Sequence, residues 1–109
     1  MGQRYCRVVS LWIRPGQEAA FDEFEREAAR RMARYGGRID AAVRTAPDGL
    51  ATGPEEAAAY EVHVVSFPDK AAAEAYGNDP ETIAARESRA AIISMTIAVP
   101  GEEAGPYLG

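Results

Sequence analysis

Cysteine, histidine and long apolar runs are all scarce in this sequence, and each shortage excludes a class of protein. The chain of 109 residues contains one cysteine, Cys6, and one histidine, His63. A single thiol cannot close an internal disulfide, and this pair cannot supply the ligands of a structural zinc site. No apolar run reaches the roughly 18 residues of a membrane-spanning helix, and the first residues lack the pattern of a signal peptide. We therefore expect a cytoplasmic protein without a membrane partner.

Positive charge is also in short supply. Lys and Arg number 12 against 17 Asp and Glu, so the formal net charge is −5. Such a chain repels phosphate backbones and has no basic tract to offset the repulsion, so we expect no nucleic-acid partner. The sequence also lacks a glycine-rich phosphate loop, a Ser-His-Asp order and metal-spaced ligands. We therefore predict neither a metal nor another cofactor.

The residues that are present predict strands and helices in alternation. Apolar periodicity places strands at residues 5–13, 38–44, 60–67 and 91–99, and helices at 17–35, 70–77 and 80–89. Asp69 and Asp79 are placed to cap the last two helices, and Pro80 suits a first helical position. The long connection at 45–58 carries Pro-Asp-Gly and Gly-Pro turn pairs, which are typical of lids, binding edges and disordered loops alike. Residues 1–99 are expected to form one domain, and 100–109 a tail.

The first predicted helix has two unlike faces. Phe21, Phe24, Ala28 and Met32 recur at three- and four-residue steps and form the buried stripe. Arg31 follows Glu27 by four residues, the favourable order for an ion pair on a helix surface. We expect the arginines of this helix to face solvent.

The order of elements predicts an α+β fold. Strand, helix, strand, strand, helix, strand is the ferredoxin-like βαββαβ arrangement, a four-stranded antiparallel sheet with both helices on one face. The first and last strands are apolar on both sides, so Val8, Trp12, Ile92 and Ala98 would leave an exposed patch larger than soluble monomers usually carry. We therefore predict a homodimer that packs sheet to sheet, as an α+β barrel.

A family resemblance supports this fold. The stretch YEVHVVSFPDKAAAEAYGNDPETIAARESRA, residues 60–90, resembles the third strand, Phe-Pro junction, interrupted helix and Pro-Glu break of the dimeric α+β barrel superfamily. Phe67, Pro68, Pro80 and Glu81 carry the match. The chain is most similar to the domain-of-unknown-function family thirteen-thirty, and more distantly to antibiotic biosynthesis monooxygenases.

The resemblance implies a fold and a range of activities. The superfamily includes cofactor-free monooxygenases, lactone isomerases, polyketide cyclases and haem-degrading enzymes, so its fold does not fix one function. The Asn, Trp and His set of the haem degraders is not matched, because Trp12 lies on the first strand and His63 on the third.

His63 and Glu61 are the candidate catalytic residues. They stand two apart on the third strand and share a face, where the carboxylate could orient an imidazole that moves protons. We expect this face to point away from the helices, with Arg44 opposite Glu61 and Ala42 opposite His63. Arg38, Asp40, Ser94 and Thr96 are predicted to share the face. The alternative is a set of polar contacts at a dimer interface, including an Arg44–Glu61 cross-strand ion pair.

A second location for a site is the space between sheet and helices. Several superfamily enzymes hold their ligand there. Tyr60, Tyr76 and Arg86 would line a site there, with Tyr35 and Arg89 as further candidates. Trp12 and Arg44 are candidate substrate contacts on the face that points away from the helices. A tyrosine hydroxyl can orient a carbonyl or phenol, and an arginine can hold a carboxylate or enolate. The alternative is that these tyrosines lie at the edge of the core, where aromatic residues are common.

Three functional predictions follow. The first is a cofactor-independent enzyme of monooxygenase, isomerase or cyclase type that acts on a small apolar or aromatic metabolite by acid/base chemistry. The second is a homodimeric ligand-binding or regulatory protein without turnover. The third is a structural pairing module in which side chains fill both faces of the sheet.

Overall fold

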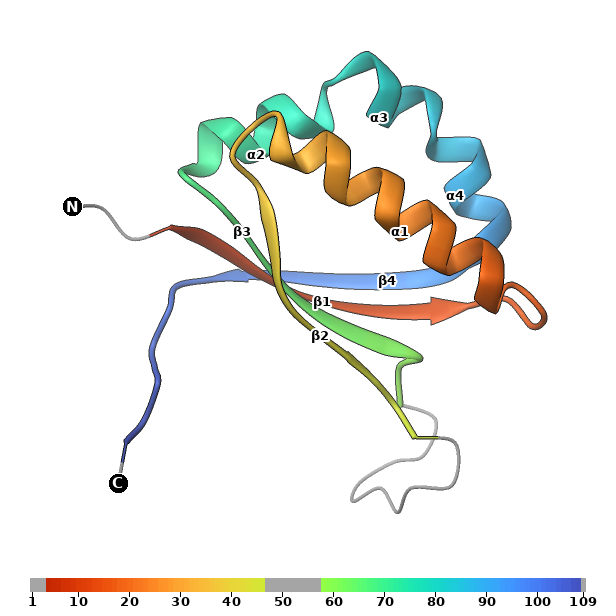
Figure 1. Cartoon of the computed structure of the whole chain (residues 1–109), viewed down its shortest axis with the longest axis horizontal. Helices are drawn as coiled ribbons and strands as arrows, with labels where there is room; N and C mark the ends of the chain where they lie inside the picture. The colour runs from red at the N-terminus through yellow and green to blue at the C-terminus, as the bar shows by residue number, and fades with distance from the viewer. Residues whose placement is uncertain (1–3, 47–57, 109) are drawn as a thin grey trace.

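A four-stranded antiparallel sheet carries all the helices on one face, as the computed structural model shows (Figure 1). The structure describes residues 4–46 and 58–108, so most of the predicted turns at 45–58 lie outside the described residues. The elements are β1 (Tyr5–Ile13), α1 (Glu18–Ala33), β2 (Arg38–Arg44), β3 (Glu61–Phe67), α2 (Lys70–Gly77), α3 (Pro80–Ala84), α4 (Arg86–Ile92) and β4 (Ile93–Gly101). The strand order is β2-β3-β1-β4, which confirms the ferredoxin-like arrangement and the central place of the third strand.

Two aspartates set the starts of the helices after β3. The Asp69 side chain accepts a hydrogen bond from the backbone N–H of Ala72 at 2.8 Å and caps α2. The Asp79 side chain accepts one from Glu81 at 2.8 Å, with Pro80 in the first turn of α3. Both predicted caps are confirmed. Each satisfies backbone N–H groups that the first turn of a helix cannot pair internally.

The turn from α1 into β2 depends on two glycines. Gly36 has a φ of +72°, a backbone conformation that side chains with a Cβ atom rarely adopt. A Cβ atom on Gly37 would lie 2.5 Å from Cε1 of Phe67. The turn therefore packs directly on a residue of β3.

The core lies between the sheet and the helices. One cluster gathers Met32, Val65, Phe67 and Ala73, and the other gathers Leu11, Phe21 and Ile93. Phe21 has no exposed surface. The apolar stripe predicted for the first helix is therefore confirmed at its centre.

The faces of β3 are the reverse of the prediction. Glu61 and His63 are buried on the side of the helices, together with Val65, whereas Val64 is exposed on the other side. Apolar residues occupy both faces of this strand, so their alternation cannot say which face is covered. Charged partners on α1 and β2 make burial of the polar pair tolerable, because a buried charge needs a partner.

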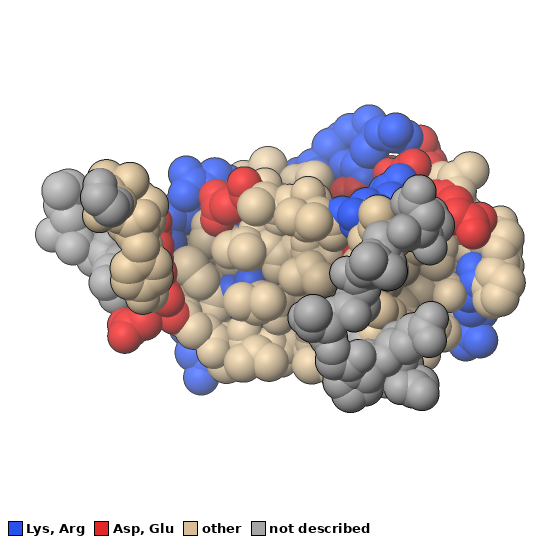
Figure 2. Space-filling model, turned by 90° about the horizontal axis from the view of Figure 1, so that it is seen from below, with Lys and Arg blue, Asp and Glu red and all other residues tan. Residues whose placement is uncertain are grey.

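The outer face of the sheet carries an exposed apolar patch, which we call the outer patch. Its residues are Val8, Val64, Met95, Ile97 and Val99, and Figure 2 shows the largely uncharged middle of this face. Two predicted members are corrected: Ile92 ends α4, and Ala98 lines the space beneath the helices. The register of β4 against β1 shifts between Trp12 and Ile13, which exchanges the faces that simple alternation assigned.

In the part of the chain that the structure describes, no helix has the length and apolar character needed to cross a membrane.

Candidate functional site

A pocket of about 250 Å³ lies between the sheet and the helices. Apolar side chains from both layers form most of its wall, including Val9, Leu11, Phe24, Met32, Val65 and Phe67. Polar and charged side chains also come from both layers: Arg7, Glu25, Arg31, His63, Tyr76, Thr82, Arg89 and Thr96. A mostly apolar hollow with a few convergent polar groups is the usual form of a small-molecule site.

His63 is held in this wall by a carboxylate. The imidazole is 4% exposed, and its Nε2 lies 2.5 Å from Oε2 of Glu61. Because an ionised carboxylate only accepts hydrogen bonds, Nε2 is the donor to Glu61, and in the neutral ring the lone pair is on Nδ1. Glu61 is in turn fixed by Arg44, whose Nε donates to Oε1 at 2.8 Å. The predicted cross-strand register, with Arg44 opposite Glu61 and Ala42 opposite His63, is confirmed.

Arg44 also connects this group to α1. Its Nη2 donates to Oδ1 of Asp22 at 2.6 Å. The hydrogen bonds to Asp22 and Glu61 raise the pKa of Arg44 above its ordinary value. A chain of contacts from Asp22 through Arg44 and Glu61 thus sets the orientation of the His63 ring.

Glu25 on α1 approaches His63 from the opposite side. Its Oε2 lies 3.8 Å from Nδ1 of His63. Burial raises the pKa of Glu25 above its ordinary value, and Arg89, together with His63 in its protonated form, opposes this shift. The imidazole therefore lies between an anchored carboxylate and a carboxyl group whose pKa is raised by burial.

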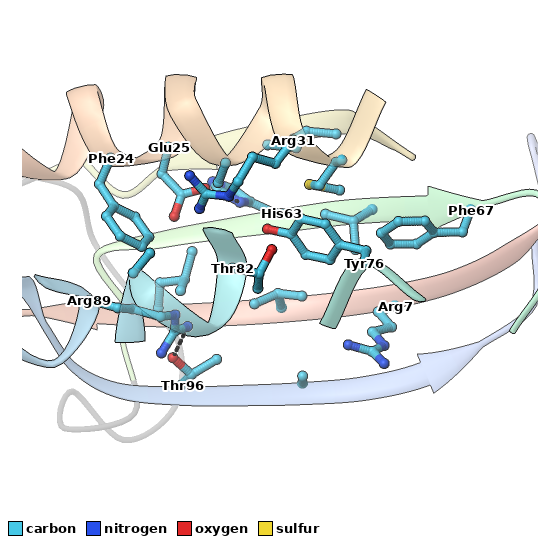
Figure 3. Close-up of a pocket in the computed structure, with 18 residues that line it drawn as sticks. Arg7, Phe24, Glu25, Arg31, His63, Phe67, Tyr76, Thr82, Arg89 and Thr96 are labelled. Carbon is cyan, nitrogen blue, oxygen red and sulfur yellow. Dashed lines mark hydrogen bonds and ion pairs between the residues drawn. The ribbon is translucent and has the colours of Figure 1, made fainter. Parts of the chain in front are cut away.

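Arg31 descends from α1 into the same space (Figure 3). It is 8% exposed, and its Nε has no hydrogen-bond partner among the described residues. The hydroxyl of Thr82, across the pocket on α3, is also buried without a described partner. The prediction that Arg31 faces solvent with Glu27 is wrong, because the pocket takes up its side chain. Buried polar groups are normally paired, so these two atoms need an explanation.

Two further groups complete the polar wall. Burial raises the pKa of the Tyr76 hydroxyl, and the positive charge of Arg31 opposes that shift. Tyr76 therefore stays protonated and can donate a hydrogen bond. Arg89 of α4 donates from Nη2 to Oγ1 of Thr96 on β4 at 2.7 Å, which fixes its guanidinium over the sheet (Figure 3).

The structure brings only some of the predicted site residues together. His63 and Tyr76 line the pocket, and Glu61 and Arg44 support His63 from behind. Tyr60 lies outside, with its ring 5.5 Å from that of Phe21 and beneath the Arg44 guanidinium.

Two other candidate contacts lie elsewhere. Trp12 pairs with Met95 on the outer face of the sheet, and Arg86 is exposed at the start of α4. The Tyr35 hydroxyl donates a hydrogen bond to Oδ2 of Asp79 at 2.5 Å, and Tyr35 does not line the pocket.

Four polar residues that were predicted to share one face with His63 are divided between the two faces. A register shift between Ile39 and Ala41 turns Arg38 and Asp40 to the outer side, where Asp40 accepts a hydrogen bond from Ser66. Thr96 faces the pocket, whereas Ser94 is exposed and bonds the carbonyl of Trp12. Irregular pairing of this kind leaves no mark in the alternation of residue types.

Glu25, Arg31 and Thr82 are site residues that the sequence interpretation missed. The helical spacing of the sequence could have indicated Glu25 and Arg31. Glu25 follows Phe21 by four residues and Arg31 follows Ala28 by three, so both lie beside the buried stripe of α1.

No cluster of three or more His, Cys, Asp or Glu residues within 4–46 and 58–108 is arranged to hold a metal ion.

The architecture and the pocket define a ferredoxin-like α+β protein with a mostly apolar hollow, carrying a few polar groups, between its two layers. The sequence profile of the family described as a domain of unknown function, DUF1330, matches residues 9–101. The chain therefore belongs to this family, as the resemblance predicted.

Solved structures with the same fold include three informative cases. A protein of unknown function from Rhodopseudomonas palustris matches 97% of this chain and 86% of its own, with a TM-score of 0.80 and 18% identity. A proposed antibiotic biosynthesis monooxygenase from Nitrosomonas europaea matches 97% and 95%, with a TM-score of 0.71 and 17% identity. A DABB family protein with a ferredoxin-like fold from Mesorhizobium loti matches 95% of this chain and 100% of its own, with a TM-score of 0.65 and 13% identity. At these identities the likeness establishes the fold alone, and no curated protein matches the sequence.

Proposed function

We propose that this protein is a cofactor-independent enzyme that transfers a proton to or from a small apolar or aromatic metabolite bound between sheet and helices. The observation that carries the proposal is the buried imidazole of His63, anchored by Glu61 and set in the wall of the pocket. A carboxylate that orients an imidazole is a recurrent device for general acid/base catalysis. A histidine that served only to fill space would not need an anchored partner on one nitrogen while the other, 3.8 Å from Glu25, makes no hydrogen bond to the described residues.

The proposed step is proton abstraction from a carbon next to a carbonyl group, or from a phenol. Nδ1 of His63 takes the proton, and the electron pair stays on the substrate as an enolate or phenolate. The protonated Tyr76 hydroxyl donates a hydrogen bond to the new oxyanion. The imidazolium is stabilised by Glu61, as a carboxylate beside a charged imidazole requires. An isomerase or cyclase then returns the proton elsewhere, so the overall reaction balances without an oxidant.

Deuterium exchange tests this function without knowledge of the natural substrate. We would incubate 2-tetralone and 3-benzoylpropionate with the protein in D₂O and follow loss of the α-proton signals by NMR. The expected result is exchange above the buffer rate that falls roughly 100-fold in His63→Gln, the usual contribution of a positioned acid/base group. Glu27→Gln, an exposed change on α1, is the control and should exchange as the unmodified protein does. Equal rates in the unmodified protein and His63→Gln would reject the catalytic role.

A homodimer is the second part of the proposal. The outer patch supports it, because five exposed apolar side chains gather on one face of the sheet. A second copy that presents the same face would cover the patch with its own, as a two-fold interface requires. The C-terminal residues leave the sheet and extend on the side away from the helices, where they would lie beside such a partner (Figure 1).

Ligand binding without turnover is the alternative function. The same pocket supports it, since the arginines and the apolar wall suit recognition whether or not a proton moves. In that case His63→Gln would bind ligands as tightly as the unmodified protein, and neither protein would exchange deuterium.

A further inference from the structure

Arg31 is a buried cation without a counter-ion in the described part of the chain. None of the ion pairs among the described residues includes its guanidinium, and its Nε makes no hydrogen bond. A buried charge in this situation is strongly unfavourable unless something else pairs with it. Arginine cannot relieve the cost by losing its proton.

The nearest candidate counter-ion does not balance this charge. Glu25 faces the same pocket, yet no ion pair joins it to Arg31, and its burial favours the neutral carboxyl. Arg7 and Arg89 add two more positive groups to the wall. The pocket therefore contains three guanidinium groups against one acid whose ionisation is disfavoured.

Another part of the pocket wall carries a hydrogen-bond donor without a described partner. The Thr82 hydroxyl is buried without a described partner, and the Tyr76 hydroxyl lies on the same side of the pocket (Figure 3). Both can donate a hydrogen bond to an oxygen bound beside Arg31, whose own hydrogen bond with the Tyr76 hydroxyl opposes the rise in the pKa of that hydroxyl. The remaining wall, with Phe24 and Phe67, is apolar and suits a ring or a short hydrocarbon.

We propose that the ligand of this pocket is a small aromatic or alicyclic carboxylic acid whose carboxylate pairs with Arg31. The planar guanidinium matches the two oxygens of a carboxylate and can bind both at once. The ring of the acid lies against the apolar wall, within reach of His63. This inference names the substrate class of the proposed function, but it concerns binding alone and stands or falls separately from catalysis.

The test compares acids with neutral molecules of the same shape. Isothermal titration calorimetry at neutral pH would measure benzoate and 2-naphthoate against benzamide and 2-naphthamide. We expect each acid to bind at least tenfold more tightly than its amide, because the amide leaves the guanidinium without a counter-charge. Amides that bind as well as the acids would overturn the proposal, and so would the absence of acid binding at millimolar concentration.

Two variants identify the residue that is responsible. Arg31→Met keeps the volume and should remove the preference for acids. Thermal unfolding of this variant without ligand should occur at the same or a higher temperature, because an uncompensated buried charge is gone. Arg30→Gln, the exposed neighbour on α1, should keep both the preference and the affinity. An Arg31→Met protein that still prefers acids would overturn the assignment to this residue.

Further variants cover the remaining outcomes. If Arg31→Met does not fold, Arg31→Lys tests the site with the charge retained, and we expect acid binding to weaken about tenfold as the paired geometry is lost. Unchanged acid binding by Arg31→Lys would contradict a bidentate contact. His63→Gln should bind acids with their preference intact. Loss of deuterium exchange together with retained acid preference would separate catalysis from this binding role.

Discussion

At the scale of single residues, the site is a small group of buried charges whose protonation depends on position. Glu61 is anchored by Arg44, whereas Glu25 makes no hydrogen bond to the described residues and lies 3.8 Å from the far side of His63. Two glutamates that touch the same imidazole are therefore suited to different tasks. Glu61 orients the ring, and the Glu25 carboxyl, whose pKa is raised by burial, faces the pocket.

Replacement of Glu25 by Gln is expected to change how stability depends on pH. Because burial raises the pKa of Glu25 above its ordinary value of 4.5, the folded protein favours the protonated carboxyl. That contribution is fully present below the ordinary value and is lost as pH rises through the folded pKa. Glu25→Gln stays neutral, so its free energy of unfolding relative to the unmodified protein should increase with pH across this window.

Urea denaturation from about pH 4 to 8 measures this difference. His63, Arg31, Arg89 and Glu61 are the charged or titratable neighbours of Glu25 and are unchanged in both proteins, so the difference reports the Glu25 carboxyl together with its interactions with these groups. Glu27→Gln on the exposed side of α1 controls for the loss of one acidic side chain. If the free energy of unfolding of Glu25→Gln relative to the unmodified protein stayed constant or fell with rising pH, the pKa of Glu25 would not be raised in the folded protein.

The sequence could predict His63 and Glu61 as partners but not the cavity that they face. Their spacing on one strand and the register with Arg44 follow from period-two alternation. Arg31 and Glu25 border the apolar stripe of α1, and a charged residue at such a border is more often solvated than buried. Only the packing of α3 and α4 over the sheet turns this border into a pocket wall.

At the scale of elements, the helix starts were predictable because their chemistry is local. A cap needs one side chain and the next few backbone groups, all of which are adjacent in sequence. Asp69→Ala should lower the free energy of unfolding by about 1 kcal/mol, since α2 loses the hydrogen bond to Ala72. Asp69→Asn keeps a side-chain oxygen that can accept this hydrogen bond, so its free energy of unfolding should fall by less than that of Asp69→Ala. Denaturant titration measures both, and an Asp69→Ala protein as stable as the unmodified one would exclude the capping role.

The turn between α1 and β2 allows a second test at this scale. In Gly37→Ala the added Cβ would lie 2.5 Å from Cε1 of Phe67 and 3.0 Å from the carbonyl oxygen of Met32. Phe67 is buried, so it must shift into the pocket or push the turn outward. We expect a loss of about 1 to 3 kcal/mol in the free energy of unfolding, the usual cost of overpacking.

Gly77→Ala is the matched control for this change. No atom lies within 4 Å of the Cβ that it would add at the end of α2, so stability should hold or rise slightly. If the two alanine variants unfolded at the same denaturant concentration, the close approach of Gly37 to Phe67 would not describe the protein in solution.

Strand faces were harder to predict than helix starts because both sides of the sheet are apolar. In β3 the alternation is the same whichever side is covered, and the shifts in β2 and β4 exchange faces within a strand. A monomer with one solvated face would have shown polar residues there. The ambiguity in the sequence therefore has the same physical origin as the outer patch.

At the scale of the whole molecule, the sheet has one face covered by helices and one that remains exposed. The covered face holds the pocket, and the outer patch lies behind it, on the other side of β1, β3 and β4. A partner sheet on the outer patch would hold the strands that carry His63 and Thr96. Dimerisation would thus rigidify the floor of the pocket without adding a residue to it.

Ile97→Asp tests the dimer within the outer patch, on β4 between Met95 and Val99. Ile97 is 48% exposed, and a two-fold interface would bring its two copies to the same contact region, where two carboxylates would be buried without partners. Native mass spectrometry should give a dimer for the unmodified protein and a folded monomer for Ile97→Asp, with circular dichroism as the check on folding. Ile83→Asp is the control, because Ile83 is 44% exposed on α3, in the helix layer, and should leave the dimer intact. A monomeric unmodified protein, or an Ile97→Asp dimer, would mean that the outer patch is not the interface.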